Sequence, residues 1–285
     1  MAGKNNDKKT LPNRRGRSIG VFDSGFGGLN ILRGIVKKLP EYDYVYLGDT
    51  ARNPYGNRSP EVVYTFTEQA VEFLIHRGCG LIVIACNTAS SDALRKIQRE
   101  YLPKYHPEVR VLGVLIPGAE KAVETTKNSR IGVIATENTV ASKAFVREIT
   151  KLNPQAKIFQ NACPLLTPLI ESGEKNAALI HFILENYLRP LLKKNIDTLI
   201  LGCTHYGILE KQIRKIVGPQ VNVISEAQVD AEKLMQYLDK HDSFEQSLKK
   251  KKLREFYSTD LTKKFKVLGS KFFGQGIDPR LAILK

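Results

Sequence analysis

Short apolar runs alternate with longer amphipathic segments along the first hundred residues of the chain. Apolar runs that end in glycine or polar turns predict strands, and segments with apolar positions three or four residues apart predict helices. The predicted strands are SIGVF (18–22), YDYVYLG (42–48) and LIVIA (81–85), and the predicted helices cover 29–39, 59–77 and 90–101. Ser59 is a suitable cap for the second helix, Pro60 fits its first turn, and Gly78 its end. Strands alternating with helices indicate parallel pairing and an α/β fold.

The same pattern begins again in the second half of the chain. The triplet Ile-Gly-Val at 19–21 recurs at 131–133, and each half later ends an apolar strand in a cysteine, Cys86 or Cys203. We therefore expect an internal duplication with two pseudo-symmetric lobes, each a mainly parallel sheet flanked by helices. Ligands bind open parallel sheets at the carboxyl ends of the strands, so we expect the active site in the interlobe cleft.

Composition limits the class of protein. A length of 285 residues with 42% hydrophobic and 26% charged residues is typical of a globular chain of one large or two ordinary domains. No apolar run approaches the roughly 20 residues that span a bilayer, and the charged start lacks the apolar stretch of a secretory signal. Four cysteines without a CxxC pair indicate reduced thiols rather than a disulfide framework. We expect a cytoplasmic protein that does not associate with membranes.

The formal net charge of +15 is concentrated at the two ends of the chain. Residues 1–17 carry +5 and residues 240–285 carry +7, which leaves +3 for everything between them. We expect residues 1–17 to form a basic, disordered tail and the run Lys249–Lys252 to be solvated surface. Basic ends attract polyanions, so a binding protein that engages nucleic acid or an acidic partner is an alternative function.

The two strand-end cysteines suggest chemistry. A free cysteine is often only a small buried hydrophobic residue, but Cys86 and Cys203 occupy equivalent places in the two halves. Each stands where a strand gives way to a helix, and a helix N-terminus or a nearby cation lowers a thiol pKa. Inversion of a carbon centre needs one base and one acid on opposite faces, and two opposed thiols supply this pair without a cofactor.

Other polar residues near the strand ends leave alternatives open. The turn "DSGFGG" after the first strand suggests a dinucleotide site, and Asp49 follows the second strand as a ribose-binding acid does, but Asn30 stands where the fingerprint needs glycine or alanine. A zinc site, as in a hydrolase, is another reading, although spacing of the CxxC or HxxxH kind is missing. The residues of such a site would be Cys86, Cys203, His205 and Asp23. We expect no metal and no cofactor. Cys79 and Cys163 look structural.

Five motifs together resemble a known family. They are "FDSGFGGL", "NPYGNRS", "ACNTAS", "ACPLLTPLIESG" and "LGCTHY", in this order. The chain resembles, from about Ser18 to its C-terminal region, the cofactor-independent glutamate racemases of the aspartate/glutamate racemase superfamily. The resemblance implies interconversion of L- and D-glutamate, which supplies D-glutamate for peptidoglycan. The same mechanism on aspartate is the nearest alternative.

The resemblance also implies roles for individual residues. Cys86 and Cys203 would be the two proton-transfer thiols, with Asp23 supporting the first, and His205 and Glu171 the second. Substrate contacts would come from Asp23, Ser24, Tyr55, Gly56, Asn87, Thr88, Thr204 and His205. Such enzymes are often homodimers, and some interact with DNA gyrase, so a secondary interaction with gyrase or another polyanion partner is part of the expectation.

Lobe boundaries follow from the resemblance too, because the chain of the family returns to its first lobe after building the second. We expect lobe A to comprise 18–112 and 225–285, and lobe B 113–224. The stretch "ISEAQVD" around Ser225 departs from the family pattern, as do Gly207 after CTHY and Ala135 in "IATENT".

Overall fold

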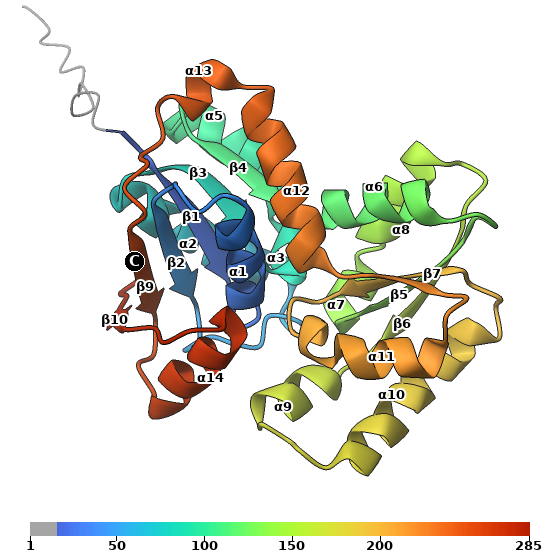
Figure 1. The fold of residues 1–285 in the computed structure, drawn as a ribbon. Coiled ribbons are helices and arrows are strands. Elements are labelled where there is room, and N and C mark those ends of the chain that lie inside the picture. The colour runs from blue at the N-terminus through green and yellow to red at the C-terminus, as the bar shows by residue number, and fades with distance from the viewer. Residues whose placement is uncertain (1–15) are drawn as a thin grey trace, which may run out of the picture.

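Two parallel β-sheets, each flanked by helices, form the protein (Figure 1). The structure is a computed structural model and describes residues 16–285. Every strand pair in both sheets is parallel, which confirms the α/β prediction.

The helices are α1 (Gly28–Lys38), α2 (Pro60–His76), α3 (Asn87–Asp92), α4 (Leu94–Lys96), a π-helical turn (Ile97–Tyr101), α5 (Leu102–Tyr105), α6 (Leu115–Thr125), α7 (Glu137–Ala141), α8 (Ala144–Leu152), α9 (Leu166–Glu171), α10 (Ala177–Leu192), a 3₁₀ turn (Tyr206–Leu209), α11 (Glu210–Val217), α12 (Glu226–Asp239), α13 (Asp242–Glu245) and α14 (Lys263–Phe273).

The first sheet combines segments from both ends of the chain. Its order is β10-β9-β2-β1-β3-β4, so the two strands that follow α13 extend a sheet built from the first half of the chain. The strands are β1 (Ser18–Asp23), β2 (Tyr44–Gly48), β3 (Cys79–Ile84), β4 (Arg110–Gly113), β9 (Arg254–Ser258) and β10 (Pro279–Leu281). Strands β1 and β3 are buried along their whole length, which explains why they read as continuous apolar runs.

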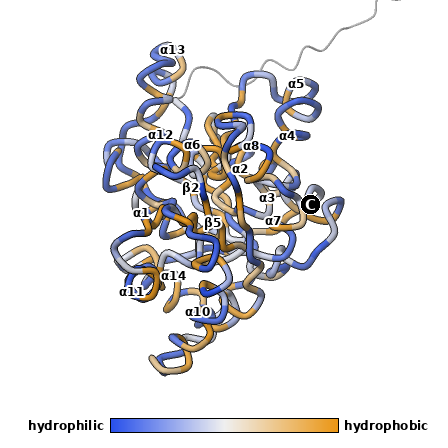
Figure 2. Tube along the Cα trace, turned by 90° about the vertical axis from the view of Figure 1, so that its right-hand side faces the viewer, coloured by the Kyte–Doolittle hydropathy of each residue, from blue (hydrophilic) through white to orange (hydrophobic). Residues whose placement is uncertain are grey.

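The second sheet is continuous in sequence and smaller. Its order is β6-β5-β7-β8, with strands β5 (Arg130–Ala135), β6 (Lys157–Ala162), β7 (Thr198–Gly202) and β8 (Asn222–Ile224). The repeated Ile-Gly-Val triplets lie in β1 and β5, which are inner strands of their respective sheets. Figure 2 shows hydrophobic stretches running through the interior of the molecule, with hydrophilic residues along many outer turns.

Local signals explain where α2 begins and ends. The Ser59 hydroxyl accepts a hydrogen bond from the backbone nitrogen of Val62, and Pro60 is the first helical residue. The helix ends at His76, and Gly78 takes a positive φ of 81° that suits glycine. The predicted helix of 90–101 is different: α3 already begins at Asn87, and the segment then breaks into short pieces with a π-helical turn. No apolar periodicity marks residues 87–89, so the sequence placed this start three residues too late.

The basic ends are only partly within the described residues. Arg17, which the sequence placed in the tail, donates from its guanidinium to the carbonyl of Glu108 and forms a bridge with Leu248. Residues 1–15 of the expected tail lie outside the described part of the chain. Three of the four lysines of Lys249–Lys252 are exposed, and Lys249 is half-buried. Within residues 16–285, no helix has the length and apolar character needed to cross a membrane.

Helix α12 connects the two halves of the molecule. It follows β8 of the second sheet, packs against α1 beside the first sheet, and also contacts α6 (Figure 1). Gly34 of α1 makes the closest approach, because a Cβ atom added there would lie 2.1 Å from the backbone oxygen of Ala227.

We predict that Gly34→Ala destabilises the protein, because the added methyl group meets a backbone carbonyl that cannot rotate away. Overpacking of this kind costs about 1–3 kcal/mol in the free energy of unfolding. Gly118→Ala is the matched control: Gly118 is also helical, but its added Cβ would lie 3.8 Å from the nearest side-chain atom. The control should be neutral or stabilising by up to about 1 kcal/mol through helix propensity. Urea unfolding curves of the three proteins measure the difference, and equal midpoints for both variants would contradict it.

Candidate active site

A cavity of about 150 Å³ lies where the two sheets present their carboxyl ends. It receives side chains from both halves of the chain. Its lining consists of Ser24, Asn53, Pro54, Tyr55, Gly56, Asn57, Cys86, Asn87, Thr88, Thr136, Glu137, Cys163, Pro164, Thr167, Pro168, Cys203, Thr204 and His205. Both strand-end cysteines are therefore in the wall of one cavity, Cys86 after β3 and Cys203 after β7.

Cys86 is buried beside two residues that follow β1. It is 5% exposed, and its Sγ lies 3.5 Å from the Ser24 hydroxyl oxygen. Burial raises the pKa of the Cys86 thiol to about 12, and the negative charge of Asp23 acts in the same direction. The sequence had suggested a lowered pKa at this helix start. The structure gives the opposite direction, because α3 is a single short helix and desolvation outweighs its N-terminus. These surroundings favour the neutral thiol of Cys86.

Cys203 has a different environment, dominated by a histidine. His205 Nδ1 lies 3.8 Å from the Cys203 sulfur, and His205 Nε2 lies 3.0 Å from Glu171 Oε1 at the end of α9. Burial alone would lower the pKa of His205, but the hydrogen bonds and negative charges of Cys203 and Glu171 outweigh burial and raise it to about 10. An imidazolium at this place can give a proton to Cys203 or stabilise negative charge on its sulfur.

Asp23 and Glu171 lie behind the cavity wall instead of in it. Asp23 is fully buried, accepts a hydrogen bond from the Gly25 nitrogen at 2.9 Å, and accepts a weaker one from the Thr204 hydroxyl at 3.3 Å. Burial raises the pKa of Asp23, and the positive charge of His205 partly opposes this shift. Neither carboxylate belongs to the lining, and the direct substrate contact expected for Asp23 stays a prediction. The other expected site residues all line the cavity.

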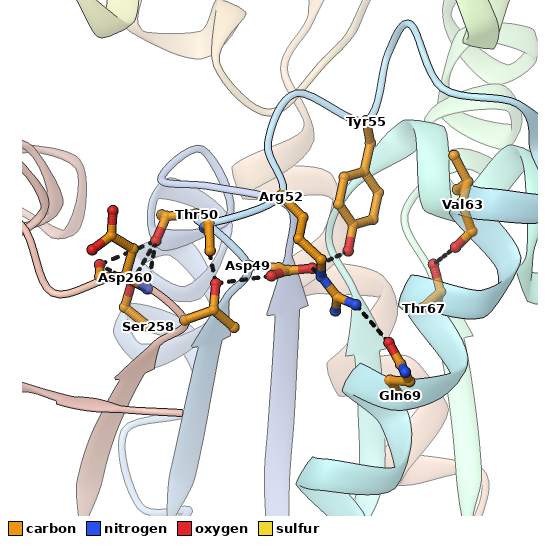
Figure 3. A network of polar contacts seen from close by, with 11 residues as sticks. Asp49, Thr50, Arg52, Tyr55, Val63, Thr67, Gln69, Ser258 and Asp260 are labelled. Carbon is orange, nitrogen blue, oxygen red and sulfur yellow. Dashed lines mark hydrogen bonds and ion pairs between the residues drawn. The ribbon is translucent and has the colours of Figure 1, made fainter. Parts of the chain in front are cut away.

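The loop after β2 is held by a buried carboxylate (Figure 3). Asp49 is fully buried and accepts hydrogen bonds from Arg52 Nε at 2.6 Å, the Tyr55 hydroxyl at 2.5 Å and the Thr259 hydroxyl at 2.8 Å. Arg52 also donates to Gln69 of α2 at 2.5 Å. Asp49, which the sequence suggested as a ribose-binding acid, is fully engaged in placing the cavity residue Tyr55.

Sequence reasoning missed several residues of the wall, among them Asn53, Thr136 and Cys163. Asn53 donates to Glu171 Oε1 at 2.8 Å, which joins the loop after β2 to the end of α9. Thr136 follows β5, the same strand-end position that singled out the cysteines, and its hydroxyl lies 3.0 Å from that of Thr88. Cys163, interpreted as structural, also lines the cavity, and burial raises its pKa so that it is a thiol. A search of every strand end for polar residues would have found the last two.

The residues suggested for zinc do not form a metal-binding group. Within residues 16–285, no cluster of three or more histidine, cysteine, aspartate or glutamate side chains has a geometry that could hold a metal ion.

Two strand-end thiols in the wall of one cavity are groups suited to proton exchange at a carbon centre. The profile of the Asp/Glu/Hydantoin racemase family matches residues 19–234, and the chain belongs to this family.

Individual relatives agree with this assignment. The glutamate racemase of Geobacter metallireducens is 42% identical to this chain, and the match covers 75% of this chain and 77% of that protein. The glutamate racemase of Syntrophus aciditrophicus is 38% identical, and the match covers 91% of this chain and 93% of that protein. A solved glutamate racemase isoform from Bacillus anthracis matches with a TM-score of 0.86 and 35% identity, covering 94% of this chain and 98% of that one. The Francisella tularensis glutamate racemase, solved in complex with D-glutamate, matches with a TM-score of 0.84 and 34% identity. The match covers 95% of this chain and 98% of that chain.

We predict that Glu171→Gln lowers the pKa of His205, because it removes the negative charge and weakens the acceptor at Nε2. The folded-state pKa of His205, about 10, lies above the value of about 6.5 for a free histidine. The Glu171–His205 pair therefore stabilises the fold fully below about pH 6.5, and this contribution is lost as the pH rises through 10.

NMR titration of the His205 ring should show the lower pKa directly, and unfolding curves should show the wild-type advantage shrinking between pH 7 and 10. Glu174→Gln is the control, because exposed Glu174 accepts only from the backbone nitrogens of Lys175 and Asn176. An unchanged His205 titration in Glu171→Gln would contradict the prediction.

Proposed function

We propose that this protein is a glutamate racemase that uses Cys86 and Cys203 as its two proton-transfer groups. The observation that carries the proposal is the shared cavity: two buried thiols reach it from separate sheets. The named relatives and the solved complex with D-glutamate support glutamate as the substrate.

The proposed reaction exchanges one proton for another at the α-carbon. One sulfur, as thiolate, takes the α-proton, and the electron pair of the broken C–H bond remains on the substrate as carbanion-like charge. The other sulfur, as thiol, delivers its proton to the opposite face and becomes the thiolate. The reverse direction exchanges the two roles, so no oxidant, reductant or further reactant is required.

The different surroundings of the two thiols fit one acting as an acid and the other as a base. Cys86 is held as a thiol by burial and by Asp23, so it begins as the acid. Cys203 has the His205–Glu171 pair beside it, which can accept or return a proton. An incoming substrate ammonium group brings positive charge into the cavity, and positive charge favours thiolate over thiol.

The wall also offers groups for holding carboxylates and the developing charge. Hydroxyl donors come from Ser24, Thr88, Thr136 and Thr204. Such donors act strongly in an enclosed site, because they are already oriented and little water competes with them. We also propose, from the resemblance and not from the cavity, that the product D-glutamate supplies peptidoglycan synthesis in the cytoplasm and that the enzyme works as a homodimer.

We predict that turnover of either glutamate enantiomer in deuterated water yields product with α-deuterium. Cys86→Ser and Cys203→Ser should each lower kcat for racemisation by about 10²-fold or more. A serine hydroxyl is a far weaker acid than a thiol, and loss of a positioned acid or base lowers a rate by about 10²- to 10⁴-fold. Circular dichroism follows racemisation, and proton NMR follows deuterium incorporation.

Cys79→Ala is the control, since Cys79 is buried in β3 away from the cavity. It should racemise at nearly the wild-type rate. Normal racemisation by Cys203→Ser would refute the two-thiol mechanism, and wild-type turnover of aspartate but not glutamate would refute the substrate.

A further inference from the structure

The first turn of α12 carries a buried glutamate directly behind the cavity wall. Glu226 follows β8, where the chain leaves the second sheet, and it is 3% exposed. Its Oε2 accepts a hydrogen bond from the Asn87 side-chain nitrogen at 2.8 Å. Asn87 comes immediately after Cys86 and lines the cavity, whereas Glu226 does not. Glu226 therefore reaches a bound ligand only through Asn87.

Several oxygens around this bond have no partner. Across residues 16–285, no hydrogen bond reaches Asn87 Oδ1, Glu226 Oε1 or either carboxylate oxygen of Asp230, one helical turn further along α12. Buried polar atoms in proteins are normally paired, so unpaired ones require an explanation. Of these three residues, Asn87 alone lines the active-site cavity. Its free oxygen is an acceptor that a hydrogen-bond donor on a ligand would satisfy.

The orientation of Asn87 depends on Glu226. A side-chain amide has a donor end and an acceptor end of nearly the same shape, so only its partners decide which way it points. In the described part of the chain, the bond to Glu226 is the one hydrogen bond of the Asn87 side chain. Because Glu226 offers an acceptor, it holds the nitrogen end of Asn87 toward α12 and leaves the oxygen end free.

We infer that Glu226 is a positioning residue that orients the Asn87 amide, so that its oxygen accepts a hydrogen bond from the α-ammonium group of the amino-acid substrate. The inference rests on the proposed function, because it assigns the amine of glutamate to a place in that site. It makes Asn87, through Glu226, a determinant of selectivity for amino acids over dicarboxylates of the same length.

The positioning role requires an acceptor but no charge. Burial raises the pKa of Glu226 well above that of a free glutamic acid; the hydrogen bond from Asn87 opposes this shift, and the charge of Asp23 adds to it. A neutral carboxylic acid keeps a carbonyl oxygen that still accepts from Asn87. Glutamine has the same shape and also keeps such an oxygen, so Glu226→Gln should preserve the orientation of Asn87.

Three variants separate positioning from packing. Glu226→Leu removes the acceptor, Glu226→Gln keeps it, and Asp230→Leu alters an equally buried carboxyl on the same helix that has no bond to Asn87. We expect Glu226→Leu to raise KM for both glutamate enantiomers about tenfold, the effect of one lost hydrogen bond to a charged group, with kcat nearly unchanged. Glu226→Gln and Asp230→Leu should keep KM within about twofold of wild type.

A ligand without the amine completes the test. Glutarate, measured as a competitive inhibitor, should bind the wild type and Glu226→Leu equally well, because it has no ammonium group to meet Asn87. Melting temperatures should differ little between Glu226→Leu and the wild type, since removal of a buried carboxyl offsets the cost of an unpaired Asn87 amide.

Four results would overturn the inference: an unchanged KM in Glu226→Leu, an equal rise in Asp230→Leu, a proportional loss of glutarate binding, or a Glu226→Leu protein that does not fold while Asp230→Leu does. Failure of the wild type to racemise glutamate is a separate result, which refutes the proposed function itself.

Discussion

The cavity depends on one constraint: two parallel sheets end at the same place, so that residues just after an inner strand of each sheet lie in a shared wall. In a parallel sheet every strand delivers its carboxyl end to one edge, and polar side chains that cannot lie within the buried strands occur just beyond it. Cys86 and Cys203 are such residues, and so is Thr136. The position of the chemistry thus follows from strand direction, and no long loop is required to carry either thiol to the cavity.

Burial then makes the two sides of the cavity unequal. Around Cys86, desolvation and the negative charge of buried Asp23 both favour the neutral thiol. Cys203 lies beside His205, whose pKa Cys203 and Glu171 raise despite its burial. A pseudo-symmetric fold therefore contains an asymmetric pair of acid–base environments, and Asn53 couples that pair to the loop after β2 through its bond to Glu171.

Features that depend on local sequence patterns, such as helix ends and buried strands, could be predicted from the sequence. Features that depend on burial by residues distant in the sequence could not. Ser59, Pro60 and Gly78 signal α2 by their backbone chemistry, and buried parallel strands read as apolar runs, so both were found. The pairing of Cys86 with Cys203 could be predicted because each follows such a run. The raised pKa of Cys86 could not, because desolvation by neighbours distant in sequence outweighs a local helix start. Asn53 was missed for a related reason, since its approach to the cavity depends on a loop anchored by Asp49. Cys163 directly follows β6, so a search of every strand end would have included it.

The position of Glu226 behind the cavity wall follows from the path of the chain between the two sheets. The family resemblance places the return of the chain to its first lobe in the segment around Ser225. In the fold this segment is the return from the second sheet, and close packing of α12 on α1, made possible by Gly34, brings its first residue against Asn87. A carboxyl buried at a crossing point without a facing cation is costly unless it meets a donor. The Asn87 amide is that donor. The bond that relieves the cost of burying Glu226 therefore also constrains a side chain of the cavity wall.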